Sequence, residues 1–528
     1  MFLIMSAAYI DIELQSEFGQ LPPSLLPLGN RRLFQHQVAL FPDGVSGYLS
    51  LPESFQLSDM DICWLTEHNV NVIKTPDGLS LGASLVAALN LIEQPLETPL
   101  HVLFGDTLIS PLPIGNDIVS VSLVEDSYNW ATVNKTSTNL WLSEKTDLST
   151  TQNHVVCGYF KFSQPRHLMR CITQSHWHFL DGLNRYQQEI GLKTVATNNW
   201  LDFGHVNTYY RSKAKFTTQR AFNELTITPD WIEKSSYKTT KIQAEANWFE
   251  QLPPRMRNYI PQFMGSYYSD KRFKYRLEYL HHTALNELYV FSHLPSVIWQ
   301  NIFHRCLDFI TECQHHLAPD NVPNSSLKDL FGLKTAQRLN EYCLSKNITI
   351  DDTWNYNGEE GTLSDLVALS EQWLPCNENN KISVLHGDFC FSNVLYDFRT
   401  NRIKTIDPRG LTHTNEQTIY GDTRYDLAKL SHSILGMYDW IIAGYYHVKI
   451  NDRHITFSLA TNPQLEDAQQ LFIDMVSERF NLSPMNLYAM QIQLFLSMLP
   501  LHDDDKMRQD ALFANAFRLY EILKGYTQ

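Results

Sequence analysis

The stretch that decides the fold of the second half of this chain is VLHGDFCFSNVLYDF, residues 384–398. An apolar run leads into His386 and Asp388, and Asn393 follows five residues after the aspartate, just before a second apolar run. This pattern indicates two short strands joined by a polar turn. Because His and Asp side chains often cap turns, these polar residues hold either the turn itself or a ligand.

A further polar side chain, Asp407, ends the next predicted strand, in RIKTIDPRG. Oxygen-bearing side chains at the ends of adjacent strands can converge on one divalent cation and one hydroxyl group, and Mg²⁺ prefers such hard oxygen ligands. Phosphoryl transfer needs a carboxylate that accepts the hydroxyl proton and metal ligands that neutralise phosphate charge. Asp388, Asn393 and Asp407 are residues of the required types.

HGDFCFSN, which begins at His386, and the IDPRG that contains Asp407 together resemble the signature of the aminoglycoside phosphotransferase and choline kinase family. This family has a protein-kinase-like fold. The resemblance implies that Asp388 is the catalytic base and that Asn393 and Asp407 bind magnesium. It also implies that His386 is a structural member of the loop.

The same resemblance assigns the other half of a kinase site. A kinase needs a strand lysine that reaches the phosphates of ATP and pairs with a glutamate on the following helix. WIEKSS supplies Lys234, and KIQAEANWFEQL supplies Glu245. The strand that ends in RLEYL is the expected hinge, where backbone groups near Tyr279 and Leu280 meet the adenine. Downstream, GDTRYDLAKL is similar to the family's closing motif, in which Asp426 braces the catalytic loop.

Each of these residues also has a simpler interpretation. Lys234 fits a solvated charge at a strand edge, and Glu245 fits an ordinary exposed helix residue. In addition, KFTTQRAF stands where a protein kinase has its glycine-rich loop, so the phosphate-loop contacts are not assigned. The combination of motifs in their expected structural context favours the kinase-like fold.

The first half of the chain has a different pattern. Up to about residue 210, apolar strands such as HVLFGDTLI and NDIVSVSLV alternate with helical segments such as GLSLGASLVAALNLIEQ. This alternation predicts a mostly parallel sheet with helices on its faces. The expected architecture is a multidomain α/β and α+β protein, with a Rossmann-like domain over 1–212, a kinase-like N-lobe over 213–292 and a predominantly helical C-lobe over 293–528. In that C-lobe we expect only two segments to interrupt the helices: VLHGDFCFSNVLYDF (384–398) and the short strand RIKTID.

Five motifs of the first half, in order, resemble a sugar-nucleotidyltransferase domain, which joins a sugar phosphate to a nucleoside triphosphate: LPPSLLPLGNRRLFQHQV, GLSLGASLVAAL, LFGDTLI, CGYFKF and NNWLDFGHVNTYY. The resemblance implies that Asp106 and Asp202 hold a metal ion. The simpler interpretations are a turn aspartate and a helix or turn cap.

This first domain departs from the family's pattern at the loop that binds the triphosphate. The family opens with a glycine-rich loop that carries an arginine, followed by a Pro-Lys pair, whereas here AAYIDIELQSEFGQ lacks the loop and Ser24 follows Pro23. Backbone amides and a cation at such a loop bind phosphate groups. Whether the domain is catalytically active therefore stays open at this point.

Composition excludes several classes of protein. Of the 528 residues, 43% are hydrophobic and 19% are charged, which is typical of a folded chain, and the formal net charge of -15 disfavours a nucleic-acid or anionic-membrane surface. Eight scattered cysteines without a CxxC pair indicate a reducing compartment, and NIFHRCLDFITECQHHLAPD is expected to be an amphipathic helix and not a metal site. No signal peptide or membrane span is recognisable, so we expect a cytoplasmic protein.

The sequence thus predicts an ATP- and Mg²⁺-dependent phosphotransferase that acts on a hydroxyl of a sugar, polyol or choline-like alcohol, with or without nucleotidyl transfer in the synthesis of capsule or surface polysaccharide precursors. One alternative is an aminoglycoside-type phosphotransferase, and another is a non-catalytic protein that senses nucleotide or sugar phosphate. Residues that contact the acceptor are expected between about 296 and 375 and in the C-terminal helices. The oligomeric state is not predicted.

Overall fold

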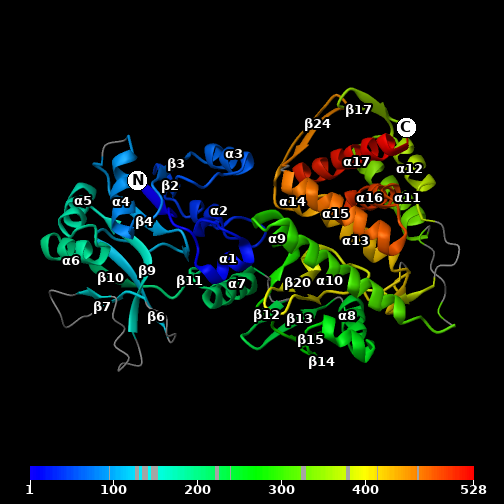
Figure 1. Cartoon of the computed structure of the whole chain (residues 1–528), viewed down its shortest axis with the longest axis horizontal. Helices are drawn as coiled ribbons and strands as arrows, with labels where there is room; N and C mark the ends of the chain where they lie inside the picture. Colours follow the sequence, from blue (N-terminus) through cyan, green and yellow to red (C-terminus); the bar gives the residue numbers. More distant parts are fainter. Residues whose placement is uncertain are drawn as a thin grey trace. The chain divides into compact units, whose positions relative to one another are not determined.

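The chain folds into two compact units, Met1–Thr217 and Thr218–Gln528, in the computed structural model (Figure 1). The structure describes residues 1–93, 96–124, 130–133, 141–143, 153–220, 225–237, 239–320, 322, 327, 329–375, 381–412, 414–460 and 463–527. Among these residues, no helix is both long enough and apolar enough to cross a bilayer. The division of the second unit into two lobes remains a prediction.

The first unit is built on one mixed sheet, whose main path has the strand order β10-β6-β9-β4-β1-β2-β3. Strand β1 is parallel to β2 and β4, β2 is parallel to β3, and β6 is parallel to β10, whereas β9 runs antiparallel to both β4 and β6. Along this path the sheet is thus mostly parallel, as its sequence pattern predicts, with β9 as the one reversed strand; beside the path, β7 pairs antiparallel with both β9 and β8. The bounds are β1 (Phe2–Met5), β2 (Gly47–Pro52), β3 (Val70–Thr75), β4 (Leu100–Phe104), β6 (Ile118–Val124), β7 (Thr132–Val133), β8 (Leu142–Ser143), β9 (Asn153–Phe162) and β10 (Lys193–Ala196).

Helices cover both faces of this sheet because its strands are apolar on both sides. Helices α4, α5 and α6 lie together on one side, away from α1 and α2 (Figure 1). On that side, Leu3 of the sheet shares a hydrophobic core with Leu85 of α4 and Leu183 of α6. The helices are α1 (Ile12–Phe18), α2 (Leu33–Val38), α3 (Asp59–Glu67), α4 (Leu81–Leu91), α5 (Pro165–Gln174), α6 (Phe179–Glu189) and α7 (Val206–Arg220).

The second unit begins with an antiparallel sheet of order β12-β13-β15-β14. Its strands are β12 (Leu225–Ile227), β13 (Trp231–Ser236), β14 (Phe263–Ser269) and β15 (Arg272–Glu278). Helix α8 (Thr239–Gln251) packs on it through apolar side chains: the ring of Phe249 lies 5.9 Å from that of Tyr275 in β15. Strand β13 and helix α8 are the two elements that the sequence predicts as carriers of Lys234 and Glu245.

The remainder of the second unit is mostly helical. The predicted amphipathic helix is present as α10, and it buries Cys306 and Cys313 in the core; Cys376 lies outside the described residues. The helices are α9 (Leu285–Phe291), α10 (Ser296–His315), α11 (Lys334–Lys346), α12 (Leu363–Gln372), α13 (Arg424–Ile434), α14 (Tyr438–Ile442), α15 (Pro463–Phe480), α16 (Pro484–Met498) and α17 (Lys506–Thr527). Two small sheets join β16 (Thr283–Ala284), β20 (Val394–Asp397) and β21 (Arg402–Thr405), and β19 (Ser383–Val384) with β22 (Tyr420–Gly421).

The expectation that only residues 384–398 and RIKTID interrupt these helices is wrong. The structure contains a further sheet of order β18-β17-β24-β23. Its strands are β17 (Trp354–Tyr356), β18 (Glu359–Gly361), β23 (Tyr446–Asn451) and β24 (His454–Leu459). Strands β23 and β24 form a hairpin whose turn residues, Asp452 and Arg453, have positive φ angles of 45° and 66°. Two-residue turns of this backbone type match the twist of paired strands. An aspartate in such a turn, between segments of alternating polarity, was the signal for the hairpin.

The buried ring of His432 on α13 makes the stability of the second unit depend on pH. It stacks on Tyr438 and packs at a tilt against Phe495, with ring centroids 4.5 Å away in both cases. Burial, followed by the charge of Lys429, holds the pKa of His432 well below its ordinary value of 6.5. The unfolded chain therefore binds a proton that the folded chain excludes, so the free energy of unfolding falls as the pH drops below about 6.5.

We expect this one histidine to lower the free energy of unfolding by about 2 kcal/mol between about pH 7 and about pH 5. His432→Phe keeps a planar ring but cannot take up the proton, so the variant should lose less stability than the wild type over this interval. Urea unfolding of both proteins at the two pH values checks this. Equal losses in wild type and variant would contradict it.

Candidate active sites

The loop between β19 and β20 is fixed by a buried carboxylate. The two oxygens of Asp426, near the start of α13, accept hydrogen bonds from the backbone amides of His386 and Gly387, each at 2.8 Å. The fully buried His386 ring contacts the Ile406 carbonyl at 3.0 Å through Nε2, and its Nδ1 faces the Asp388 amide at 3.3 Å. As expected from the sequence, Asp426 and His386 hold the loop, and the Asp388 carboxylate is left for other contacts.

The Asp388 side chain is held on both of its oxygens. Lys429, on the helix that carries Asp426, lies 2.8 Å from Oδ1, and the side-chain amide of Asn393 donates to Oδ2 at 3.1 Å. Burial raises the pKa of Asp388, but the charge and hydrogen bond of Lys429, together with the charges of His386 and Arg409, outweigh burial and leave the pKa below its ordinary value. Asp388 is therefore an oriented, ionised carboxylate.

Lys429 was not predicted from the sequence as a site residue. It stands three residues after Asp426 within GDTRYDLAKL, and residues three apart lie on the same side of a helix. The motif therefore contained the signal: if Asp426 faces the catalytic loop, a cation at this spacing faces it too.

Lys234 of β13 lies between two carboxylates. Its Nζ is 2.8 Å from Oε2 of Glu245 on α8 and 3.0 Å from Oδ1 of Asp407, just after β21. Glu245 is 1% exposed and also accepts a hydrogen bond of 2.9 Å from the hydroxyl of Tyr275. Burial lowers the pKa of Lys234, but the charges of Asp407 and Glu245 outweigh it and raise the pKa. The glutamate is thus buried, and both side chains are paired.

The segment after β21 depends on close backbone packing. Asp407 has a φ of 55° and Gly410 a φ of 61°, both in the left-handed region. A side chain at Gly410 would collide with the carbonyl of Ala244, the residue before Glu245 on α8. The glycine therefore lets this segment approach α8, and the approach brings Asp407 within reach of Lys234.

The oxygen donors around Asp388 fit a magnesium ion. Asn393 uses its amide nitrogen toward Asp388, which leaves its Oδ1 available, with only a long 3.4 Å contact from the Ser392 hydroxyl. Asp407 uses Oδ1 toward Lys234 and retains its second carboxylate oxygen. Oxygen donors are what Mg²⁺ takes in proteins, together with waters and substrate phosphates. Asn393 and Asp407 would hold such an ion.

The predicted hinge follows β15 directly. The backbone amide of Tyr279 donates to the carbonyl of Asp230 at 3.0 Å, so this amide is engaged within the protein. Burial, followed by the charge of Glu287, raises the pKa of the Tyr279 hydroxyl to about 12. Contact of the adenine with the backbone near Leu280 therefore remains a prediction.

In the first unit, Asp106 and Asp202 lie close together. Strand β5 (Thr107–Ile109) pairs with β11 (Trp200–Asp202) so that Asp202 stands opposite Thr107, next to Asp106. A Cβ placed on Gly204 would lie 2.8 Å from Oδ2 of Asp106 and 3.5 Å from Oδ1 of Asp202. Burial, then the negative charge of Asp202, raises the pKa of Asp106 to about 6. A half-buried and a buried carboxylate at one point suit a divalent cation.

Ser24 stands where the sugar-nucleotidyltransferase pattern has a lysine, and it supplies no positive charge to the site of Asp106 and Asp202. It is fully buried in a single 3₁₀ turn (Pro23–Leu25), and its amide accepts no anion because it donates to the Ser6 hydroxyl at 3.0 Å. The position at which the sequence departs from the nucleotidyltransferase pattern therefore also offers no phosphate-binding group in the structure.

A different group of potential metal ligands in the described residues of the first unit is His167, Cys171 and Glu189. The Glu189 carboxylate is already bound by Arg170 at 2.6 Å, Arg185 at 2.9 Å and His167 at 2.7 Å. These contacts account for the cluster as a salt-bridge network between α5 and α6.

No family model matches the chain, and comparison with curated proteins also gives no match. Solved structures similar to parts of it include kinase-like phosphotransferases and nucleotidyltransferases. An aminoglycoside phosphotransferase mutant solved with AMP-PNP and hygromycin B has 16% identity and a TM-score of 0.35, over 59% of this chain and 98% of that one. A nucleoside-diphosphate-sugar pyrophosphorylase from Vibrio cholerae has 14% identity and a TM-score of 0.33, over 40% and 99%.

An inositol-1-phosphate CTP transferase from T. maritima has 15% identity and a TM-score of 0.30, over 41% of this chain and 95% of that one. TM-scores of this size do not establish a shared fold.

Replacement of Asp426 by Asn should destabilise the second unit. The amide group offers only one acceptor oxygen and turns an NH₂ group toward a backbone N–H, so one buried donor loses its partner. We expect a loss of about 2–4 kcal/mol in the free energy of unfolding. Asp474→Asn on the exposed face of α15 is the matched control, since this change leaves a solvated contact with Gln470. Chemical denaturation measures both, and equal losses would contradict the prediction.

Proposed function

We propose that the chain is an ATP- and Mg²⁺-dependent phosphotransferase that acts on a hydroxyl group of a small molecule. The observation that carries the proposal is the position of Lys234, which bridges Glu245 and Asp407 at 2.8 Å and 3.0 Å. These are the parts that a kinase uses to hold nucleotide phosphates and metal. These residues come from segments far apart in the sequence. Asp388 lies in the loop before β20, and Asp407 follows β21, the strand that pairs with β20.

In the proposed reaction, the acceptor oxygen forms a bond to the γ-phosphorus of ATP while the bond from that phosphorus to the β–γ bridging oxygen breaks, and ADP leaves. Asp388 accepts the hydroxyl proton, and Lys429 and Asn393 keep its carboxylate oriented. Lys234 would bind phosphate oxygens, with Glu245 fixing its ammonium group. A bound Mg²⁺ supplies charge neutralisation at the phosphates.

The acceptor belongs to the class of sugars, polyols and choline-like alcohols, and the supply of precursors for surface polysaccharide fits a chain that also carries a nucleotidyltransferase-like region. A non-catalytic sensor is disfavoured by the ordered proton-accepting site. A binding protein does not require a carboxylate held by both a lysine and an amide. An aminoglycoside-type phosphotransferase would use the same chemistry at Asp388.

Asp388→Asn should lower kcat by about 10²–10⁴-fold, because this is the usual contribution of a general base. ADP formation with Mg²⁺ and a panel of sugars, polyols and amino alcohols measures the effect. Asp270→Asn, at an exposed turn between β14 and β15, is the control and should retain wild-type turnover. The proposal fails if Asp388→Asn retains turnover, or if the wild type phosphorylates no compound and the substitution leaves nucleotide binding unchanged.

Nucleotidyl transfer is a second candidate function, favoured by the close approach of Asp106 and Asp202. The buried, uncharged Ser24 disfavours it, because a triphosphate would lack the cation that usually binds it.

If the first unit is active, release of pyrophosphate from a nucleoside triphosphate and a sugar phosphate should occur in the wild type. Asp106→Ala should reduce it by at least about 10²-fold, since a charge-stabilising ligand at the reacting phosphates is lost. Asp388→Asn serves as the control and should leave this activity intact. Absence of pyrophosphate release with every nucleoside triphosphate would exclude this second function.

A further inference from the structure

A group of cations lies beside Asp388 on the helical side of the loop. We propose that the acceptor carries a negatively charged group, a phosphate or a carboxylate, in addition to its hydroxyl, and that Arg409 and Lys334 bind this group. The inference rests on the proposed function and specifies its substrate class. It differs from the neutral or cationic acceptors that the sequence resemblance implies.

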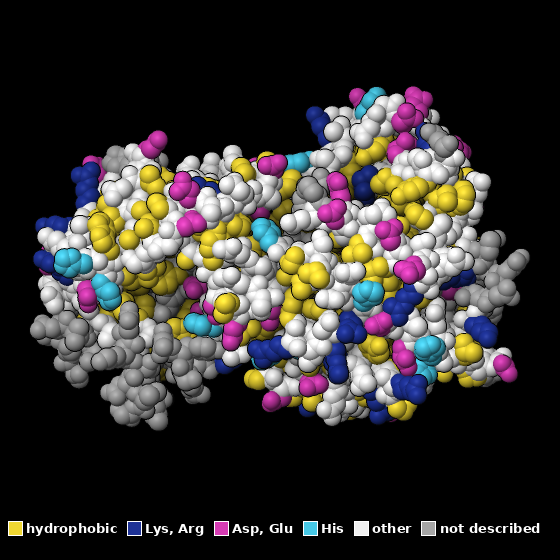
Figure 2. Space-filling model, in the orientation of Figure 1, with side chains coloured by type: hydrophobic (Ala, Val, Ile, Leu, Met, Phe, Trp, Pro, Cys, Tyr) yellow, Lys and Arg dark blue, Asp and Glu magenta, His cyan; other side chains and the backbone are white. Residues whose placement is uncertain are grey.

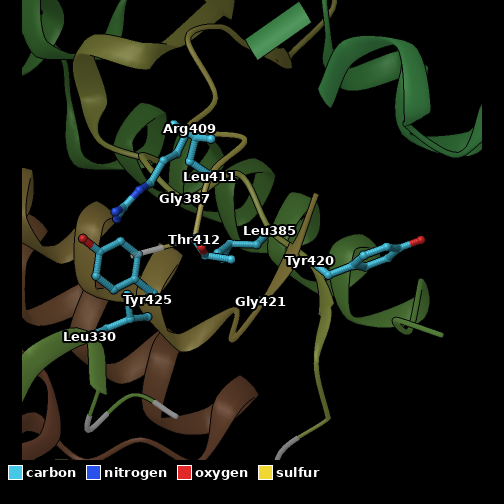
Figure 3. Close-up of a pocket in the computed structure, with 9 residues that line it drawn as sticks. All are labelled: Leu330, Leu385, Gly387, Arg409, Leu411, Thr412, Tyr420, Gly421 and Tyr425. Atoms are coloured by element: carbon cyan, nitrogen blue, oxygen red, sulfur yellow. The ribbon is translucent and has the colours of Figure 1, made fainter. Parts of the chain in front are cut away.

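A pocket opens next to the catalytic loop (Figure 3). Its lining includes Gly387, the residue before Asp388, together with Arg409 and Tyr425. The other lining residues are Leu330, Leu385, Leu411, Thr412, Tyr420 and Gly421. Every lining residue comes from the catalytic loop, the segments around it or the helical part of the second unit. The pocket is therefore placed where an acceptor could reach Asp388.

Arg409 is held at the edge of this pocket by the loop itself. Its amide donates to the His386 carbonyl at 2.9 Å, and a Cβ on Gly387 would lie 2.8 Å from the Cβ of Arg409. The arginine side chain thus leaves the backbone over the residue that precedes Asp388. In Figure 3 it extends toward the side of the pocket on which the Tyr425 hydroxyl lies.

Lys334 approaches the same region from α11. The ring of Phe331, three residues earlier, lies 5.6 Å from that of Tyr425, which places the start of α11 against the pocket wall. Burial, followed by the charges of Arg409, Arg338 and Lys429, lowers the pKa of Lys334 to about 7, while the charge of Asp388 acts in the opposite direction. Three positive charges and one negative charge, that of Asp388, therefore act on Lys334. The buried Asp426 carboxylate is already bound by the amides of His386 and Gly387.

The positive charge of this group is not balanced within the described parts of the chain. Lys429 pairs with Asp388, and Arg338 donates to the carbonyl of Ser497 at 3.0 Å. Neither Lys334 nor Arg409 forms a salt bridge or a side-chain hydrogen bond with any described residue. Half-buried cations without a counter-charge cost free energy, and an anionic ligand would remove that cost.

This excess of positive charge contrasts with the rest of the protein. The chain has a formal net charge of -15, and on the face shown in Figure 2 acidic and basic side chains are interspersed. An anion meets unfavourable long-range potential around such a protein unless a local cationic site compensates. The cations at the pocket therefore fit a specific anion-binding site better than a general attraction of anions to the protein.

The position of the cations favours the acceptor over the nucleotide. The nucleotide phosphates are proposed to bind at Lys234 and Asp407. Lys234 lies on β13, and its partner Glu245 lies on α8. Arg409 and Lys334 line or flank a pocket to which neither β13 nor α8 contributes a residue. Asp388 directly follows Gly387, which lines this pocket, so a base that takes a proton from the acceptor is adjacent to it.

The test compares matched acceptors that differ in charge. Glycerol 3-phosphate and glucose 6-phosphate are the phosphate-bearing members, and glycerate and gluconate carry a carboxylate. Glycerol and glucose are neutral, and choline and glucosamine are cationic. ADP formation gives kcat and KM for each compound and for ATP, in the wild type and in the variants Arg409→Gln, Arg409→Lys, Lys334→Met and Lys346→Met. Lys346 is exposed at the far end of α11 and provides the matched control.

We expect kcat/KM at least tenfold higher for a phosphate- or carboxylate-bearing member than for its neutral counterpart. Arg409→Gln and Lys334→Met should reduce that ratio at least tenfold through KM for the acceptor, Arg409→Lys should restore part of it, and Lys346→Met should not change it. The two anionic series show which anion is recognised. Preference for neutral or cationic members overturns the proposal, as does a rise in KM for ATP alone in the two variants.

Calorimetric binding of glycerol 3-phosphate and glycerate to the ADP-loaded protein separates this inference from the proposed function. Binding that Lys334→Met weakens at least tenfold supports an anion site even if no compound is phosphorylated, in which case only the phosphotransferase proposal fails. No binding of either anion overturns the inference, whereas turnover of a neutral acceptor that Asp388→Asn abolishes would leave the phosphotransferase proposal standing.

Discussion

The ammonium group of Lys234, held between Glu245 and Asp407, is the interaction on which the candidate kinase site depends. It connects strand β13, helix α8 and the segment after β21, which come from separate parts of the sequence. Glu245 is nearly completely buried and also bound by Tyr275, so its charge requires a cation at this place. The pairing therefore serves the stability of the antiparallel sheet and its helix as well as the proposed chemistry.

A second buried carboxylate, Asp426, has the corresponding role for the catalytic loop. Burial raises the pKa of Asp426 to about 7, while the hydrogen bonds from His386 and Gly387 act to lower it. One helix, α13, supplies both this brace and Lys429, the partner of Asp388. The position of the base and its charge are thus set by two residues three apart on one helix. Around it, the helical side of the loop is cationic, and the candidate nucleotide side combines a lysine with carboxylates.

The sequence predicts most elements that carry site residues. The residue spacing around Lys234 and Glu245 indicates a strand followed by a helix, and β13 and α8 have that order. The hairpin of β23 and β24 was missed because its turn contains Asp452 and Arg453 in place of the more familiar glycine. Lys429 was missed for a different reason: its significance depends on which side of α13 faces the loop, and that is decided by the packing of Asp426.

By itself, the sequence determined the residue types and the order of the motifs: a proton-accepting aspartate, oxygen ligands at strand ends, and a strand lysine with a helix glutamate. It also determined that Ser24 replaces a cation in the first unit. Tertiary structure decided which charges meet. Lys234 meets Asp407 only because Gly410 allows the segment after β21 to pack against α8. Arg409 lies beside Asp388 because its amide binds the His386 carbonyl, and Lys334 follows a turn whose Phe331 packs against Tyr425 of α13. Charge balance at a site is a property of distances in space, and spacing along the chain does not specify them.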